Sequence, residues 1–137
     1  MLKILCIFLC ILGLNADTLK IATFNTQNLF DDKIDGSEYS DFKNGSWGQR
    51  QYNHKLNQIS TILLDLKADI IALQEIENED VLKALASKTG YKFYKFATLN
   101  SNSPVGLGFL SNKAITKSKK FIVNGVKTRP ILMICVD

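Results

Sequence analysis

A strand, an amphipathic helix and a second strand in succession most strongly constrain the fold. Residues 19–24, LKIATF, have the pattern of a strand and lead into polar residues. Residues 31–50, rich in Asp, Ser and Gly, are expected to form an exposed loop. Residues 52–66 carry apolar side chains at positions 52, 56, 59, 63 and 66, which indicates a helix with one buried face. Residues 68–75, ADIIALQE, are apolar on both faces, as in a strand covered from both sides of a layered α/β fold.

The rest of the chain predicts one more helix and a series of strands. Asn78 is a favourable helix cap, and a lysine precedes Gly90, so a helix is expected over residues 79–88. Four strand-like runs follow, at residues 91–98, 105–111, 119–123 and 129–136. The pair Asn124-Gly125 is typical of a two-residue hairpin between the last two runs. A sheet sandwich with flanking helices, in one domain, is the expected architecture.

Residues 1–16 predict a secretory signal peptide. They contain Lys3, an apolar run over residues 4–12, and a small residue at Ala16. The run is shorter than the roughly 18 to 20 residues that a membrane span requires, so no stable membrane anchor is expected, and a permanent anchor is the alternative. The mature domain would then cover residues 17–137. Export would place it in the periplasm or outside the cell.

The cysteine and histidine content argues against internal disulfides and zinc sites, and the net charge bears on the kind of substrate. Removal of the signal peptide would take away Cys6 and Cys10 and leave Cys135, so the mature chain could form no internal disulfide. No Cys/His spacing resembles a zinc site, and the sequence has one histidine, His54. The formal charge of +4 is scattered along the chain. This charge suits an anionic substrate, and it equally suits a solvated lysine-rich surface.

Two polar residues follow the two best-defined strands. Asn25 comes after IATF, and Glu75 comes after IIALQ. If these strands are parallel neighbours, both side chains emerge at the same carboxyl edge, where open α/β sheets bind ligands. A carboxylate with amide and water oxygens suits Mg²⁺. The alternative is structural, with Glu75 capping the following segment and Asn25 making a turn.

Three segments together resemble the endonuclease/exonuclease/phosphatase superfamily of metal-dependent phosphoesterases. Residues 19–30, LKIATFNTQNLF, are similar to its first motif, and residues 68–78, ADIIALQEIEN, to its second. Residues 105–115, VGLGFLSNKAI, are similar to a later strand of the same superfamily. The resemblance implies half of a four-layer α/β sandwich, with a mixed sheet and flanking helices. It also implies an exported phosphodiesterase that cleaves DNA or RNA, with phospholipids and inositol phosphates as alternative substrates.

The resemblance assigns roles residue by residue. Glu75 would bind Mg²⁺, with Mn²⁺ or Ca²⁺ as alternatives, and Gln74 would support it. Asn25 would be a catalytic residue that orders the metal site or the scissile phosphate. Arg129 would contact a substrate phosphate, for which a guanidinium fork is well suited, and a solvated arginine is the alternative.

The sequence also departs from the superfamily pattern. The catalytic histidine motif and the later Asp-containing motifs of the superfamily are not present, and His54 is expected to be a surface residue. The chain stops at Asp137, at the end of an apolar strand, so a carboxyl-terminal half is expected to be missing. Its absence would uncover apolar side chains, with Phe93, Leu107 and Phe109 as candidates. A non-catalytic remnant or binding module is therefore the alternative to an enzyme, and a secreted structural or adhesive protein is a third class.

Overall fold

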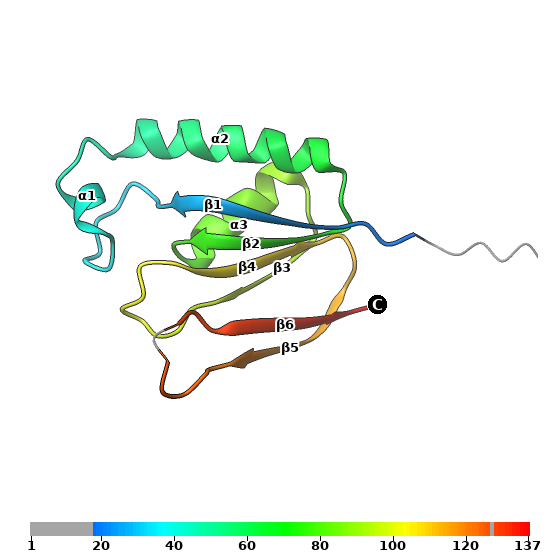
Figure 1. The fold of residues 1–137 in the computed structure, drawn as a ribbon. Helices are drawn as coiled ribbons and strands as arrows, with labels where there is room; N and C mark the ends of the chain where they lie inside the picture. The colour runs from blue at the N-terminus through cyan, green and yellow to red at the C-terminus, as the bar shows by residue number, and fades with distance from the viewer. Residues whose placement is uncertain (1–17, 127) are drawn as a thin grey trace, which may run out of the picture.

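The computed structural model describes residues 18–126 and 128–137, and the expected signal peptide lies outside them. The described chain is a mixed α/β fold, as predicted. Its elements in chain order are β1 (Ile21–Leu29), α1 (Ser40–Lys43), α2 (Gln49–Leu66), β2 (Ile70–Ile76), α3 (Glu79–Thr89), β3 (Phe93–Ala97), β4 (Gly106–Ser111), β5 (Ile115–Phe121) and β6 (Ile131–Val136). Figure 1 shows them in layers, with α2 and α3 on one side of a sheet and the β5–β6 pair on the other.

The central sheet has four strands in the order β1-β2-β4-β3. β1 and β2 are parallel neighbours, as the strand–helix–strand order predicted, and α2 forms the crossover between them. β4 runs antiparallel to both β2 and β3, so the sheet is mixed. The parallel pairing brings the carboxyl ends of β1 and β2 to the same edge of the sheet.

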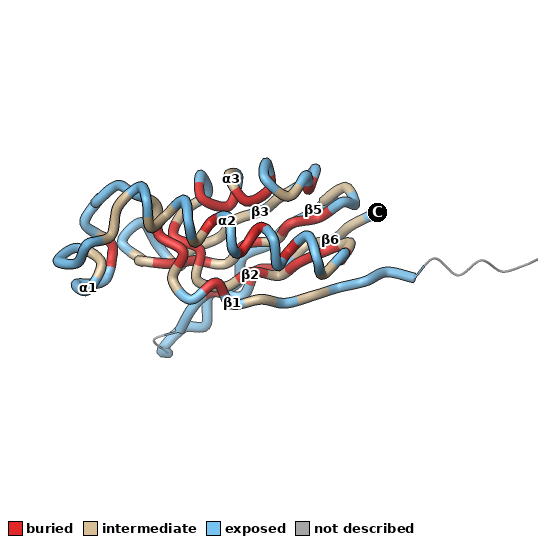
Figure 2. The backbone as a smooth tube through the Cα atoms, turned by 90° about the horizontal axis from the view of Figure 1, so that it is seen from above, coloured by how far each residue is buried: buried red, intermediate tan, exposed pale blue. Residues whose placement is uncertain are grey.

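The main core lies between this sheet and the two long helices. α2 and α3 each bury one face against the sheet, and in Figure 2 buried stretches alternate with exposed ones along the helices. The fully buried side chains are Leu29 and Phe30 near the end of β1, Leu63 in α2, Ile71, Leu73 and Ile76 in β2, Val81, Leu82 and Leu85 in α3, and Leu110 and Ser111 in β4. Gly108 permits this close packing, because a Cβ there would lie 2.7 Å from Leu82 Cδ1.

Helix α3 follows the sequence signals closely. The Asn78 side chain accepts a hydrogen bond from the Val81 amide at 2.9 Å, which satisfies a free donor of the first turn. Gly90 ends the helix in the left-handed conformation, with φ of 77°. The expected helix over residues 79–88 is confirmed, with one further residue at its end.

The β5–β6 pair is antiparallel as expected, but the expected two-residue turn is wrong. Residues 122–130 connect the strands, and Asn124-Gly125 lies within this longer loop, with Gly125 at φ of 76°. The first strand pair is Phe121 with Ile131. Pro130 has no amide hydrogen to donate to the ladder, and β6 begins directly after it.

Several expectations about exposure differ from the observed surface. Residues 31–48 do not form a fully exposed loop, because Phe42 packs on Phe30 and Trp47 at ring-centroid distances of 4.3 and 5.0 Å. Phe93 is exposed, whereas Leu107 and Phe109 are partly buried. Within residues 18–126 and 128–137, no helix combines the length and apolar character needed to cross a membrane.

Candidate metal and phosphate site

Glu75 lies in a bulge rather than at the last position of its strand. β2 continues to Ile76, which is fully buried, and its pairing with both β1 and β4 skips from Gln74 to Ile76. Glu75 has φ of 65°, in the left-handed region that a residue with a side chain rarely occupies. A bulge redirects a side chain relative to the regular strand. The bulge therefore presents the carboxylate at the sheet edge while the strand continues into the core.

The end of β1 is irregular at the same level. Gln27 and Asn28 have φ of 53° and 61°, and the pairing of β1 with β2 shifts between Asn25 and Leu29. Such conformations cost about 1–3 kcal/mol each and persist only where surrounding contacts impose them. One such contact comes from the buried Thr26, whose hydroxyl lies 2.9 Å from the carbonyl oxygens of both Gln74 and Glu75 and shares its single proton between them.

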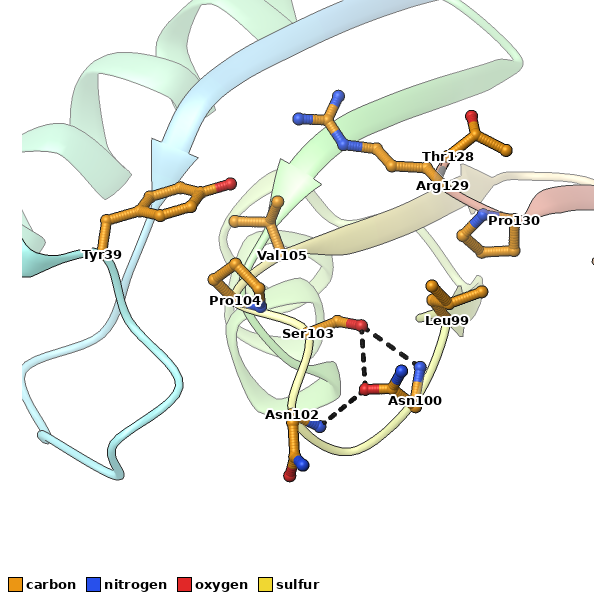
Figure 3. Close-up of a pocket in the computed structure, with 10 residues that line it drawn as sticks. All are labelled: Tyr39, Leu99, Asn100, Asn102, Ser103, Pro104, Val105, Thr128, Arg129 and Pro130. Carbon is orange, nitrogen blue, oxygen red and sulfur yellow. Dashed lines mark hydrogen bonds between the residues drawn. The ribbon is translucent and has the colours of Figure 1, made fainter. Parts of the chain in front are cut away.

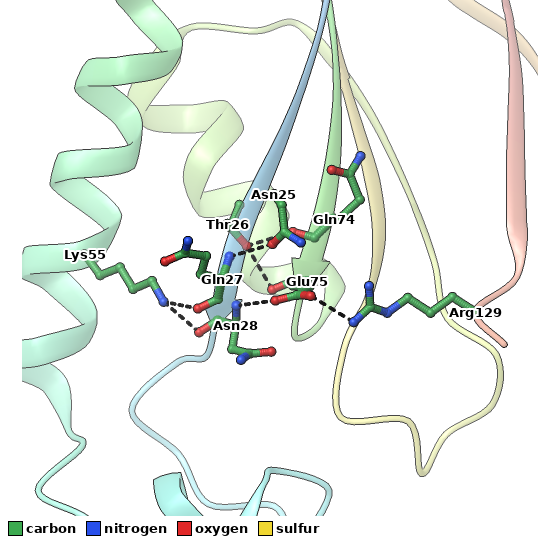
Figure 4. A network of polar contacts seen from close by, with 8 residues as sticks. All are labelled: Asn25, Thr26, Gln27, Asn28, Lys55, Gln74, Glu75 and Arg129. Atoms are coloured by element: carbon green, nitrogen blue, oxygen red, sulfur yellow. Dashed lines mark hydrogen bonds and ion pairs between the residues drawn. The ribbon is translucent and has the colours of Figure 1, made fainter. Parts of the chain in front are cut away.

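Two groups hold the Glu75 carboxylate (Figure 4). The Asn28 amide donates to Oε2 at 3.1 Å, and Arg129 Nη2 donates to Oε1 at 2.9 Å. Burial alone would raise the pKa of the Glu75 carboxyl. The side-chain amide of Asn25, the guanidinium of Arg129 and the backbone N–H of Asn28 together hold that pKa below its ordinary value. Glu75 is therefore an anion whose side chain is 16% exposed.

Lys55 supports this arrangement from the side of α2. Its Nζ donates to the carbonyl oxygens of Gln27 and Asn28, the second at 3.0 Å, and so spans the two left-handed residues of β1. Nζ also lies 5.7 Å from the centre of the Trp47 ring. Burial lowers the pKa of Lys55, and the negative charge of Glu75 opposes that shift. Lys55 thus links the helix to the backbone that holds Glu75.

Of the other residues expected at the site, Asn25 and Arg129 lie at the sheet edge, whereas the Gln74 side chain points toward β1 (Figure 4). Asn25 is exposed at the edge, and its Oδ1 accepts a hydrogen bond from the Gln27 amide at 2.7 Å. Gln74 Nε2 donates to Thr23 Oγ1 at 3.0 Å, so its side chain turns toward β1 and does not bond to the Glu75 carboxylate. Arg129 reaches the site from the loop before β6, and its side chain is 45% exposed. The structure brings Asn25, Glu75 and Arg129 to one edge, and their roles stay predictions.

A second group of carboxylates comes from the loop after β1 and from the residue that follows β2. Asp35, Glu38 and Glu77 each place one oxygen within 4.8 Å of the others, and Glu38 and Glu77 are buried. Burial raises the pKa of Glu77 to about 7, the Asp31 N–H that donates to it at 2.6 Å opposes the rise, and neighbouring carboxylates add to it. We call these three residues the acidic cluster.

The acidic cluster was not predicted from the sequence. Glu77 lies about forty residues after Asp35 and Glu38 in the chain, and only the spacing of Asp35 and Glu38 and the position of Glu77 just after Glu75 could have suggested the cluster. Acidic residues in a Gly- and Ser-rich loop are ordinarily solvated, so neither signal is specific.

Comparison with known proteins identifies the family. The sequence model of the Endonuclease/Exonuclease/phosphatase family matches residues 20–131, most of the chain. The chain belongs to the endonuclease/exonuclease/phosphatase family. Searches of curated proteins and of solved structures gave no significant match. Members of this family are generally dependent on divalent metals and typically act on phosphodiesters.

The oxygen donors of this family member fit a hard divalent cation. At the sheet edge, Glu75 offers an ionised carboxylate beside the Asn25 amide, with solvent access on one side. Oxygen ligands of this kind, completed by water and substrate oxygens, are those that Mg²⁺ takes in proteins. The acidic cluster supplies a second set of carboxylate oxygens. The ion pair with Arg129 occupies one Glu75 oxygen, so a cation there would share the carboxylate or release the guanidinium.

Proposed function

We propose that the protein is an exported Mg²⁺-dependent phosphodiesterase, and specifically an endonuclease that hydrolyses phosphodiester bonds in DNA or RNA. The observation that carries the proposal is the Glu75–Arg129 pair, at 2.9 Å, on the edge where two parallel strands end. It sets a carboxylate for a cation beside a guanidinium for a phosphate. Family membership supports the reaction class, and the expected signal peptide over residues 1–16 supports export.

Different site residues would bind the substrate phosphate and the metal ion. Arg129 is half exposed and can turn from Glu75 to a substrate phosphate, to which it can donate two parallel hydrogen bonds. Glu75, freed from the guanidinium, would be the principal metal ligand, and Asn25 is close enough in the fold to orient the phosphate or a bound water. A bound Mg²⁺ would supply charge stabilisation for the phosphate oxygens during hydrolysis.

A second candidate function is binding without hydrolysis. The sequence contains a single histidine, and His54 is exposed on α2, on the polar side expected from its spacing. Hydrolysis by this reaction class needs a group that accepts a proton from the attacking water. On this alternative the chain would bind a cation and a phosphate at the Glu75 edge without cleaving the substrate.

A plasmid-nicking assay tests the proposal. The whole chain is incubated with supercoiled DNA and Mg²⁺, alongside Glu75→Gln, Arg129→Met and the control Glu79→Gln, an exposed carboxylate in the first turn of α3. The proposal expects that the unaltered chain nicks DNA and that EDTA abolishes the nicking. Glu75→Gln should lose the activity and Glu79→Gln should retain it. Arg129→Met should require a higher DNA concentration for the same rate.

Binding measurements on the same proteins separate the two candidates. Mg²⁺ and phosphate binding that Glu75→Gln and Arg129→Met remove, without nicking by the folded chain, would favour binding without hydrolysis. Nicking that survives in Glu75→Gln would contradict both candidates.

A further inference from the structure

A pocket of about 630 Å³ lies directly beside Arg129. Three loops build it: Tyr39 comes from the loop after β1, Leu99 and Val105 from the loop between β3 and β4, and Pro130 from the loop before β6. Figure 3 shows the Tyr39 ring on one side, Leu99 and Pro130 on the other, and Val105 between them. Its volume falls within the range of ordinary small-molecule sites.

Arg129 connects the pocket to the candidate phosphate position. It lines the pocket, and its guanidinium also donates to Glu75. A phosphate held by Arg129 would therefore have the pocket as its immediate neighbour. Whatever group is esterified to that phosphate on the pocket side must enter it or be turned away.

The lining selects for a neutral and largely apolar group. Tyr39, Leu99 and Val105 contribute apolar surface, and Arg129 is the only charged residue among the lining residues within 18–126 and 128–137. A quaternary ammonium would need several aromatic rings or a carboxylate, and the described part of the lining has one aromatic ring and no carboxylate. A polyhydroxylated ring such as inositol would need many hydrogen-bonding partners in place of this apolar surface.

Polar groups among the lining residues suit the edge of a nucleobase. Asn100 Oδ1 is fixed by the Asn102 amide at 3.0 Å and the Ser103 hydroxyl at 3.3 Å. These contacts leave its Nδ2 without a partner among residues 18–126 and 128–137, so it is free to donate. Tyr39 is 41% exposed, and its ring lies perpendicular to that of Phe30 with the ring centroids 5.9 Å apart, so it can offer a face on which a base stacks.

We propose that this pocket is a nucleobase subsite, which takes the base attached to the phosphate that Arg129 holds. The inference rests on the proposed function and deepens it, because it assigns a binding position to the base next to that of the phosphate. Stacking on Tyr39 and contact with Leu99 and Val105 would supply sequence-tolerant affinity, and Asn100 would contact the base edge.

Calorimetric titrations of the whole chain test the subsite. The probes are adenosine 5′-monophosphate, ribose 5-phosphate, inorganic phosphate and adenosine, with phosphocholine and a short-chain phosphatidic acid as competing chemistries. The expected result is that the nucleotide binds roughly five- to a hundredfold more tightly than ribose 5-phosphate. Tyr39→Ala and Leu99→Ala should each reduce that ratio severalfold and leave inorganic phosphate binding unchanged. Leu64→Ala, an exposed leucine on α2, is the matched control and should change neither.

The probes distinguish failure of the subsite from failure of the proposed function. Equal binding of the nucleotide and ribose 5-phosphate would overturn the subsite and leave the phosphate site intact. Tighter binding of phosphocholine or the phosphatidic acid than of adenosine 5′-monophosphate would also overturn the subsite. If no phosphate compound binds, the proposed function fails, and the subsite is then judged by adenosine alone: shifts in the methyl NMR signals of Leu99 and Val105 support it, and unshifted signals overturn it.

Discussion

The helix-covered face of the central sheet and the carboxyl edge of the same sheet differ in backbone regularity, polarity and solvent exposure. The face is regular, apolar and buried, with Leu63, Leu73 and Leu82 almost fully removed from solvent. The edge is polar and partly exposed, and it holds three of the four residues with positive φ that are not glycine in the described chain. Regular packing stabilises the fold, whereas the edge holds strained backbone in place with hydrogen bonds. Strain of this kind concentrates at functional sites, although strain alone does not show function.

A core substitution should produce the largest loss of stability. Leu82→Ala removes a fully buried side chain between α3 and β4, and it should lower the free energy of unfolding by about 2–5 kcal/mol. Leu64→Ala, on the exposed side of α2, should change it by less than about 0.5 kcal/mol. Urea unfolding followed by circular dichroism measures both. Similar losses for the two variants would contradict the division between a packed face and the rest of the molecule.

Glu77 should make stability fall as pH rises. Its pKa is about 7 in the folded chain and near 4.5 when unfolded, so the folded chain keeps a proton that the unfolded chain has already released. The folded state therefore loses stability from about pH 4.5 to pH 7, by an amount on the order of a few kcal/mol. Glu77→Gln should flatten this profile while keeping the acceptor for the Asp31 amide. Urea unfolding in EDTA across this pH range is the measurement, and an unchanged slope in the variant would rule out Glu77 as its source.

Lys55→Met should weaken the edge without opening the core. It removes charged hydrogen bonds to Gln27 and Asn28, and a loss of about 1.5–3 kcal/mol in unfolding free energy is expected. Because these bonds hold the Asn28 amide against Glu75, Mg²⁺ binding measured by calorimetry should weaken as well. Lys55→Arg should recover part of both quantities. Loss of stability with unaltered Mg²⁺ affinity would show that Lys55 acts on the fold alone.

The smallest effect concerns the backbone of Glu75 itself. Glycine tolerates positive φ, so Glu75→Gly should be more stable than Glu75→Ala by about 1 kcal/mol, although both lose the carboxylate. Lys67, which ends α2 at φ of 47°, provides the comparison outside the site through Lys67→Gly and Lys67→Ala. Thermal unfolding of the four variants measures the strain at each position. A Glu75→Gly variant no more stable than Glu75→Ala would mean that position 75 relaxes out of the left-handed conformation.

The sequence predicted the regular face much better than the edge. The periodic leucines and isoleucines of α2, the Asn78 cap and Gly90 are local signals, and each acts in the structure as expected. Parallel pairing of β1 and β2 followed from the crossover helix. The face could be predicted because its residues have preferences that agree with the fold around them.

The details of the edge were not readable in the same way. No residue of Gln74-Glu75-Ile76 favours the left-handed conformation by its local preference. Contacts with the rest of the fold impose it, through the burial of Ile76 and the hydrogen bond from the Thr26 hydroxyl. Lys55 was not singled out from the sequence, because its contacts with Gln27 and Asn28 depend on how α2 lies beside β1. Asn25 and Glu75 were predicted from their positions after two strands, and the resemblance added Arg129 and the role of each residue. The direction of the Gln74 side chain was not predicted, because it depends on the pairing register with β1.

The separation of the edge residues along the chain has a kinetic consequence. The contact of Asn28 with Glu75 closes 47 residues of chain, and that of Arg129 with Glu75 closes 54. Long closures of this kind form slowly, because the entropy of the loop is lost before the contact can compensate for it. The helices can form early from local contacts, and the two sides of the Glu75 carboxylate come together late. A ligand that needs both sides would bind only molecules that have completed folding, so its affinity would add to their stability against unfolding.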